Sequence, residues 1–140
     1  MTLSIRNQFP GTVTSVTPGG VMATVGVLLT GGRHLTAAIT LEAAEELGLA
    51  EGSAVRALVK STEVSLATEP VAGLSIRNQL PGTVAEVSTG AAMASVKVAV
   101  DDGTRLTAAI TKDAAVDLAL TAGTPVVALI KATEVGLATP

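Results

Sequence analysis

The residues best suited to chemistry in this sequence are hydrogen-bond donors and cations rather than nucleophiles. Ser4 and Arg6 stand two residues apart on a predicted strand, so their side chains should leave the same face. Lys60 adds a compact positive charge, and Ser61 adds a hydroxyl donor. Arginine presents its donors in a fixed fork that suits a tetrahedral oxyanion. Such a set predicts a site for a fully ionised dianion, which needs donors and positive charge but no general base.

Thr40 is a further candidate ligand, because it precedes a predicted helix whose first N–H groups and dipole favour an anion. A plain role as the helix cap fits Thr40 equally well. In the same way, Arg6 could pair with an acid such as Glu63, and Lys60 could simply be solvated. The sequence leaves these alternatives open beside anion binding.

Catalysis and direct metal binding have little support. His34 is the single histidine, and a lone histidine beside a Gly-Gly turn is typical of a solvated loop. With no cysteine and no second imidazole, the chain lacks the usual nucleophile pairs and metal ligands. The acidic residues from Glu42 to Glu46 indicate a solvated helix face. We therefore expect no enzyme activity, no cofactor and no metal held directly by side chains.

The composition limits the class of partner. The net charge of -3 and the pI of about 5.0 argue against a nucleic acid held by general electrostatics. Phe9 is the only aromatic residue, so the stacking surfaces of single-strand binders are absent. No apolar run approaches the roughly 18 residues of a membrane helix, and no basic and apolar leader follows Met1. These features predict a cytoplasmic protein that binds neither nucleic acid nor membrane.

The elements that must position the donors occur twice. The segment Leu3–Gln8 returns as Leu74–Gln79, an offset of 71 residues. Of the 67 ungapped pairs that this offset gives, 38 are identical, which indicates a tandem duplication of one small unit. We expect one domain over residues 1–69, a linker over 70–73 and a second domain over 74–140.

The joining segment is short. Its Pro and Gly suit a linker, and the five residues from Glu69 to Gly73 reach at most about 17 Å. The two domains should therefore lie close together, and units this small need to pack against something.

Each unit predicts several strands and one short helix. Apolar residues alternate at Val21, Ala23, Val25 and Val27, again at Val55, Ala57 and Val59, and then at Val64 and Leu66. This period of two indicates half-buried strands. Turn signals at 30–32 and 101–103 predict hairpins. Pro10–Gly11 predicts a turn after the first strand, and Asn7 a turn residue or one that bonds the backbone.

The helix is predicted over 41–47, with Thr40 as its cap and Gly48 at its end. Strands flanking one short helix in about 67 residues suggest a small Greek-key barrel. The expected fold class is all-β with one short helix per unit, arranged as two tandem OB-like small barrels.

Four motifs together resemble the molbindin or Mop domain, which is of the TOBE type. They are Ser-Ile-Arg-Asn-Gln at the start, Gly-Thr-Val, Ala-Ala-Ile-Thr ahead of the helix, and Lys-Ser-Thr-Glu-Val at the end of the unit. The resemblance covers essentially the whole chain, as two tandem copies. It implies an OB-like barrel in each unit and binding of molybdate, often also tungstate, at interfaces between domains and subunits. Tandem members form trimers, which bring six such domains together.

The resemblance also implies two ligand sets. The first is Ser4, the main-chain N–H of Ile5, Arg6, Thr40, Lys60 and Ser61. The second is Ser75, Ile76, Arg77, Thr111, Lys131 and Ala132. The family commonly has Ala where this chain has Ile5 and Ile76, and Ala132 lacks the hydroxyl of Ser61. We therefore expect two sites that are not identical. His34, whose counterpart in the second unit is Arg105, is a further difference between the halves.

The expected function is storage and homeostasis of molybdate, and of tungstate, in a homotrimer. Cavity size would separate molybdate from sulfate, and the O–H of partly protonated phosphate would face donors and be disfavoured. An oxyanion-sensing regulatory or accessory module acting through a partner protein is the alternative. An OB-type oligonucleotide binder and an enzyme have less support.

Overall fold

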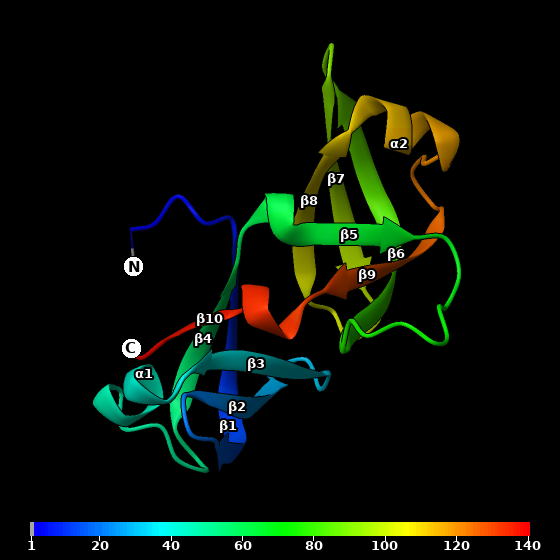
Figure 1. Cartoon of the computed structure of the whole chain (residues 1–140). Coiled ribbons are helices and arrows are strands. Elements are labelled where there is room, and N and C mark those ends of the chain that lie inside the picture. The colour runs from blue at the N-terminus through cyan, green and yellow to red at the C-terminus, as the bar shows by residue number, and fades with distance from the viewer. Residues whose placement is uncertain (1) are drawn as a thin grey trace.

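The computed structural model describes residues 2–140 and consists mostly of strands (Figure 1). The first half holds β1 (Asn7–Pro18), β2 (Met22–Leu29), β3 (His34–Thr40), α1 (Leu41–Glu46), β4 (Ala54–Val59), the 3-10 turn η1 (Ser61–Glu63) and β5 (Val64–Ala67). The second half holds β6 (Asn78–Thr89), β7 (Met93–Val100), β8 (Arg105–Thr111), α2 (Lys112–Asp117), β9 (Pro125–Ile130), η2 (Ala132–Glu134) and β10 (Gly136–Ala138). The expected all-β fold with one short α-helix per unit is confirmed, as two curled five-stranded sheets.

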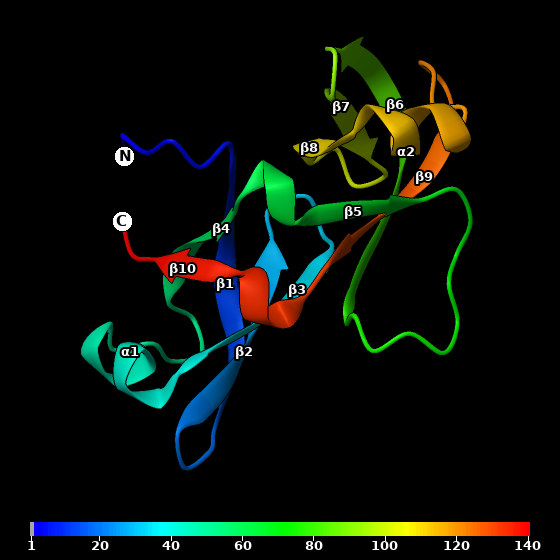
Figure 2. The same cartoon turned by 45° about the horizontal axis from the view of Figure 1, so that its top comes forward.

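The two halves exchange their last strands. The sheet orders are β10-β4-β1-β2-β3 and β5-β9-β6-β7-β8, so β5 of the first half completes the second sheet and β10 completes the first. Figures 1 and 2 show β10 (red) beside β4, and β5 (green) beside β9. The units 1–69 and 74–140 therefore describe the repeat in the sequence, whereas each sheet takes one strand from the other unit. Every pairing in both sheets is antiparallel.

The period-two pattern identifies the buried faces. Ala23, Val25 and Val27 are buried in β2, and Val55, Ala57 and Val59 are buried in β4. The one error is Val21, which precedes β2 and is 77% exposed. Small and β-branched side chains fill the core because the strands of a tightly curled sheet leave little room between them.

The prediction of a turn at Pro10–Gly11 is wrong, because both residues lie inside the 12-residue strand β1. Gly11 stands where β1 pairs with β4 on one side and begins to pair with β2 on the other. A Cβ there would lie 2.7 Å from the Leu28 carbonyl oxygen. The repeat's Gly82 is equally tight, at 2.5 Å from the Ala99 carbonyl oxygen. Glycine is therefore required here because the backbones of two strands approach closely, and not because the chain turns.

The helix signals are confirmed. Thr40 caps α1 by accepting a hydrogen bond from the Ala43 N–H at 3.1 Å, and Gly48 follows the helix with φ +61°. In the second half Thr111 caps α2 in the same way, but Ala119 occupies the left-handed position with φ 52°. The hairpin turns at 30–32 and 101–103 are also where they were expected.

Within residues 2–140 the two α-helices have six residues each, and neither is long or apolar enough to cross a membrane.

Candidate oxyanion-binding site

Each predicted donor set gathers at one small cavity. The first cavity, of about 210 Å³, is lined by Ser4, Ile5, Arg6, Lys60, Ser61 and Thr62. The second, of about 220 Å³, is lined by Ser75, Ile76, Arg77, Lys131, Ala132 and Thr133. We call them the first and second donor cavity. Five of the six residues predicted for each site therefore lie together, and no carboxylate lines either cavity.

The sixth residue of each set lies elsewhere in the chain. Thr40 and Thr111 are exposed helix caps and do not line the donor cavities. Each hydroxyl oxygen accepts the N–H of the residue three positions on. Thr40 was expected to be either an anion ligand or a helix cap, and within this chain it caps the helix.

The register of two strands brings the donors together. Asn7 at the start of β1 pairs with Val59 at the end of β4, so the residues before Asn7 and after Val59 are neighbours. Ser4 to Arg6 directly precede Asn7 and Lys60 directly follows Val59, so both leave the pairing at the same end. The expectation that Ser4 and Arg6 lie on a strand is wrong, since β1 begins only at Asn7. An irregular segment suits this role, because it can turn its N–H groups toward the cavity.

Most donors of the first cavity are free of protein partners. In the described chain, no hydrogen bond involves the Ser4 hydroxyl, the Ile5 N–H, the Lys60 ammonium or the Ser61 hydroxyl. Arg6 is the exception: its Nε donates to the Ser4 carbonyl at 3.2 Å, and one terminal nitrogen donates to the Leu3 carbonyl at 3.1 Å. These bonds fix the guanidinium and leave its other N–H groups available.

The alternative of an Arg6–Glu63 ion pair is wrong for the described residues, where the one ion pair joins Arg33 and Asp101. Donors that are unpaired, close together and without a carboxylate are suited to an anion with several acceptor oxygens.

Asn7 and Asn78 position the two cavities. They are the buried polar residues of the described chain, 2% and 3% exposed. The Asn7 amide donates to the Thr107 carbonyl and accepts from the Thr107 N–H, both at 2.8 Å, and Asn78 does the same with Thr36. Thr107 and Thr36 lie on β8 and β3, the edge strands of the opposite sheets. Of the two roles expected for Asn7, a turn residue or one that bonds the backbone, the structure shows the second. Asn7 thereby anchors the segment that carries Arg6 to the other sheet.

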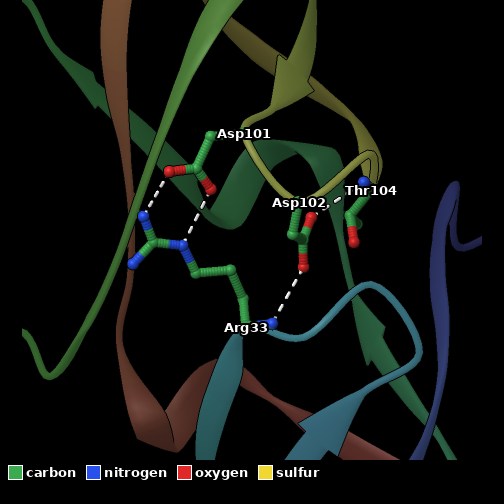
Figure 3. A network of polar contacts seen from close by, with 4 residues as sticks. All are labelled: Arg33, Asp101, Asp102 and Thr104. Atoms are coloured by element: carbon green, nitrogen blue, oxygen red, sulfur yellow. Dashed lines mark hydrogen bonds and ion pairs between the residues drawn. The ribbon is translucent and has the colours of Figure 1, made fainter.

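A second contact between the halves was not foreseen from the sequence. Figure 3 shows Arg33, before β3, donating to both carboxylate oxygens of Asp101, one of them at 2.8 Å. Its backbone N–H donates to Asp102 at 3.0 Å, and the Thr104 N–H donates to the other oxygen of Asp102 at 2.8 Å. The repeat gives no signal for this contact, because Thr104 occupies the position of Arg33 in the second unit. We call this set of four residues the hairpin latch.

The latch changes the acidity of its two carboxyl groups. The hydrogen bond from Arg33 lowers the pKa of Asp101. Burial raises the pKa of Asp102, but hydrogen bonds from Thr104 and from the Arg33 N–H outweigh this effect and leave the pKa lowered. The Arg33 pKa is raised by the same hydrogen bond to Asp101, so the pair stays ionised at neutral pH.

This chain is similar to known proteins in both sequence and structure. The family model for the TOBE domain matches residues 3–66 and again 74–137. The molybdenum transport protein ModE of Azotobacter vinelandii is 41% identical over 138 residues, covering 99% of this chain and 51% of that protein. The molybdenum-pterin-binding protein MopA of Rhodobacter capsulatus is 42% identical over 141 residues, covering 100% of this chain and 53% of that protein. The chain thus spans about half the length of these curated relatives.

Among solved structures, the cytoplasmic molybdate-binding protein ModG in its molybdate-bound form matches with a TM-score of 0.97 and 45% identity. The match covers 100% of both chains. The fold of the whole chain is therefore that of a known architecture, and the chain is a member of the TOBE domain family, carrying two tandem copies of that domain.

Proposed function

We propose that this chain binds molybdate, and tungstate by the same chemistry, in its two donor cavities. The observation that carries the proposal is that both cavities collect free donors and cations and contain no carboxylate. The likeness to ModG over the full length supports molybdate as the anion.

Each residue has a distinct part in this proposal. Lys60 and Arg6 supply positive charge, and the guanidinium, fixed by its own backbone, approaches the anion without first losing side-chain entropy. Ser4 and Ser61 donate hydroxyl hydrogens, and Ile5 donates its main-chain N–H. The second cavity repeats this set with Ser75, Ile76, Arg77 and Lys131, while Ala132 offers no hydroxyl. None of these groups is a nucleophile activated by a base, so the anion is bound and released without chemical change.

Thr40 and Thr111 complete the sites from a neighbouring copy of the chain in this proposal. Thr40 pairs with Met22 across β2 and β3, and Met22 and Val21 are exposed at 43% and 77%. Thr111 pairs in the same way with Met93, which is 47% exposed. Exposed apolar side chains of this kind mark contact surfaces. A homotrimer would let each of the six domains present its threonine to a donor cavity of another copy.

The biological role that follows is storage and homeostasis of molybdate in the cytoplasm. A second candidate is an accessory module that senses the oxyanion and acts on a partner protein. The matches to ModE proteins, about half of whose length the chain spans, favour this candidate. A stoichiometric partner recovered with the tagged chain, and released or recruited by molybdate, would distinguish the accessory module from a store.

Calorimetric titration tests the anion. We expect heat and saturation with molybdate and tungstate at micromolar concentration, and no binding of sulfate or phosphate to the donor cavities at the same concentration. Absence of molybdate binding, or equal binding of sulfate, would contradict the proposal. Light scattering on the same samples tests the trimer, and a monomer that binds at full affinity would contradict the part given to Thr40 and Thr111.

A further inference from the structure

A third cavity has a different character from the two donor cavities. It measures about 360 Å³ and lies where the start of β1 meets strands β6, β7 and β8 of the second sheet. Its charged lining residues are Arg6, Glu86, Lys97 and Arg105. We call it the cationic cavity, because three cations face one carboxylate.

The register explains why these side chains converge. Lys97 on β7 stands directly opposite Glu86 on β6 and opposite Thr107 on β8. Directly paired residues share one face of a sheet, and Arg105, two residues before Thr107, shares it too. Asn7 holds the preceding Arg6 at this place through its two hydrogen bonds to Thr107.

The cations of this cavity are not neutralised by the protein. The one ion pair of the described chain is Arg33–Asp101, so Arg6, Lys97 and Arg105 have no carboxylate within salt-bridge distance. The neighbouring Glu86 compensates one of the three charges at longer range. The cavity therefore carries a net positive charge, in a chain whose overall net charge is -3.

The first half lacks this charge pattern. Ser15, Gly26 and His34 occupy the positions of Glu86, Lys97 and Arg105. A Cβ at Gly26 would lie 2.8 Å from the hydroxyl oxygens of both Ser15 and Thr14, so these hydroxyl groups occupy the space beside Gly26. The cationic cavity is thus a feature of one half of a duplicated chain.

We propose that the cationic cavity is an accessory site for a tetrahedral dianion, which is either a free inorganic oxyanion or the phosphate group of a phosphate monoester. Lys97 on β7, Arg105 on β8 and Arg6 before β1 supply charge-assisted donors to this cavity from three different segments of the chain. Its volume exceeds the 210 and 220 Å³ of the donor cavities, which leaves room for an organic substituent on the anion. This site goes beyond the proposed function and does not depend on which anion the donor cavities hold.

Arg6 also links the accessory site to the first donor cavity, since it lines both. Two dianions held on either side of one guanidinium repel each other and compete for its N–H groups. Occupancy of one site should therefore weaken the other, and this coupling is reciprocal. The second donor cavity, built around Arg77, should be unaffected.

The test uses the intact chain with inorganic phosphate, sulfate and glycerol 2-phosphate as probes, followed by calorimetry and backbone amide shifts. The main variant is K97G/R105H, which restores the first-half residues, with K97A/R105A as a second variant if glycine loosens β7. K112A is the matched control, because Lys112 is an exposed cation outside the cavity. Thermal unfolding checks that each variant is folded.

We expect amide shifts around Glu86, Lys97 and Thr107 in the wild type, and binding weakened about tenfold or more in both double variants. E86S, which removes the carboxylate, should tighten the same binding several-fold. Binding of the monoester as well as phosphate assigns the site to both free oxyanions and phosphate monoesters. Binding of the inorganic ions alone assigns it to free oxyanions. Unchanged affinity in the double variants, or no shift with any probe, overturns the accessory site, whereas loss of molybdate binding in R77A/K131A reports only on the second donor cavity.

Discussion

Arg6 and Lys60 show how the site depends on single residues. They are 54 positions apart in the sequence. Arg6 precedes Asn7 and Lys60 follows its partner Val59, so both lie beyond the same end of the antiparallel pairing and line the first donor cavity. Removing Lys60 leaves the hydrogen bonds of the other donors unchanged, whereas removing Arg6 also removes its two hydrogen bonds to the Ser4 and Leu3 carbonyls.

Arg6→Ala and Lys60→Ala should each weaken molybdate binding to the first cavity by about 1.5–3 kcal/mol, the scale of a charge-assisted hydrogen bond. Calorimetry would then resolve one weakened and one unchanged class of site. Arg56→Ala is the control, since Arg56 is an exposed cation on β4 outside both donor cavities. Wild-type affinity in both test variants would show that the ligand assignment is wrong.

Position 61 and its repeat at 132 offer a matched pair of substitutions. Ser61→Ala should weaken the first site by about 0.5–1.5 kcal/mol, and Ala132→Ser should strengthen the second by a similar amount, because one hydroxyl donor is lost or gained. Titration of both single variants and the exchanged double variant measures this. The exchanged variant should reverse the order of the two affinities; an unchanged order would mean that the hydroxyl does not reach the anion.

At the scale of elements, the two helix ends differ by one residue. Gly48 holds the left-handed conformation after α1, and Ala119 holds it after α2. A left-handed alanine carries steric strain that glycine avoids.

Ala119→Gly should therefore raise the free energy of unfolding by up to about 1 kcal/mol, and Gly48→Ala should lower it by about the same amount. Chemical denaturation of the two variants provides the measurement. Shifts of the same sign in both variants would contradict the strain argument.

At the scale of the whole molecule, Asn7 and Asn78 connect each sheet to the edge strand of the other. Asn7→Ala leaves both backbone groups of Thr107 without this partner and should cost about 1–3 kcal/mol of stability. It should also weaken the first donor cavity more than the second, since Asn7 anchors the segment that carries Arg6. Asn78→Ala is the mirror control, and equal weakening of both cavities by either variant would show a purely global effect.

The hairpin latch predicts how stability changes with pH. Asp101 and Asp102 have lowered pKa values in the folded chain, so the folded state binds fewer protons than the unfolded state in acid. The stabilisation is complete above the ordinary carboxyl pKa of about 3.9 and is lost as the pH falls through the lowered folded values. Because Arg33 and Asp101 are 38% and 50% exposed, the effect should be small and weakened by salt.

Arg33→Thr, which installs the residue of the second half, should flatten the loss of thermal stability between pH 4 and about pH 2. Melting curves of wild type and variant across this range are the measurement. A variant with the same pH slope as the wild type would show that the latch is not formed in solution.

Local signals in the sequence determined much of this protein. The period of two, the Thr caps, the hairpin turns and the repeated donors each depend on neighbouring residues, and they predicted the β fold with its short helices. They also placed Arg6 and Lys60 in one ligand set, which the register of β1 and β4 brings to one cavity. The family resemblance added the anion, since donor geometry alone does not name it.

Only the tertiary structure decided which sheet each last strand completes. Residues 64–67 and 135–138 are nearly identical, VSLA and VGLA, so either strand has the apolar pattern to pair with β4 or with β9. An alternating pattern records which face of a strand is buried, but not which edge it pairs with. For the same reason the sequence did not predict the role of Gly11, the edge contacts of Asn7 and Asn78, the hairpin latch or the cations around Lys97. Each of these features depends on residues that are distant in the chain and become neighbours only in the folded structure.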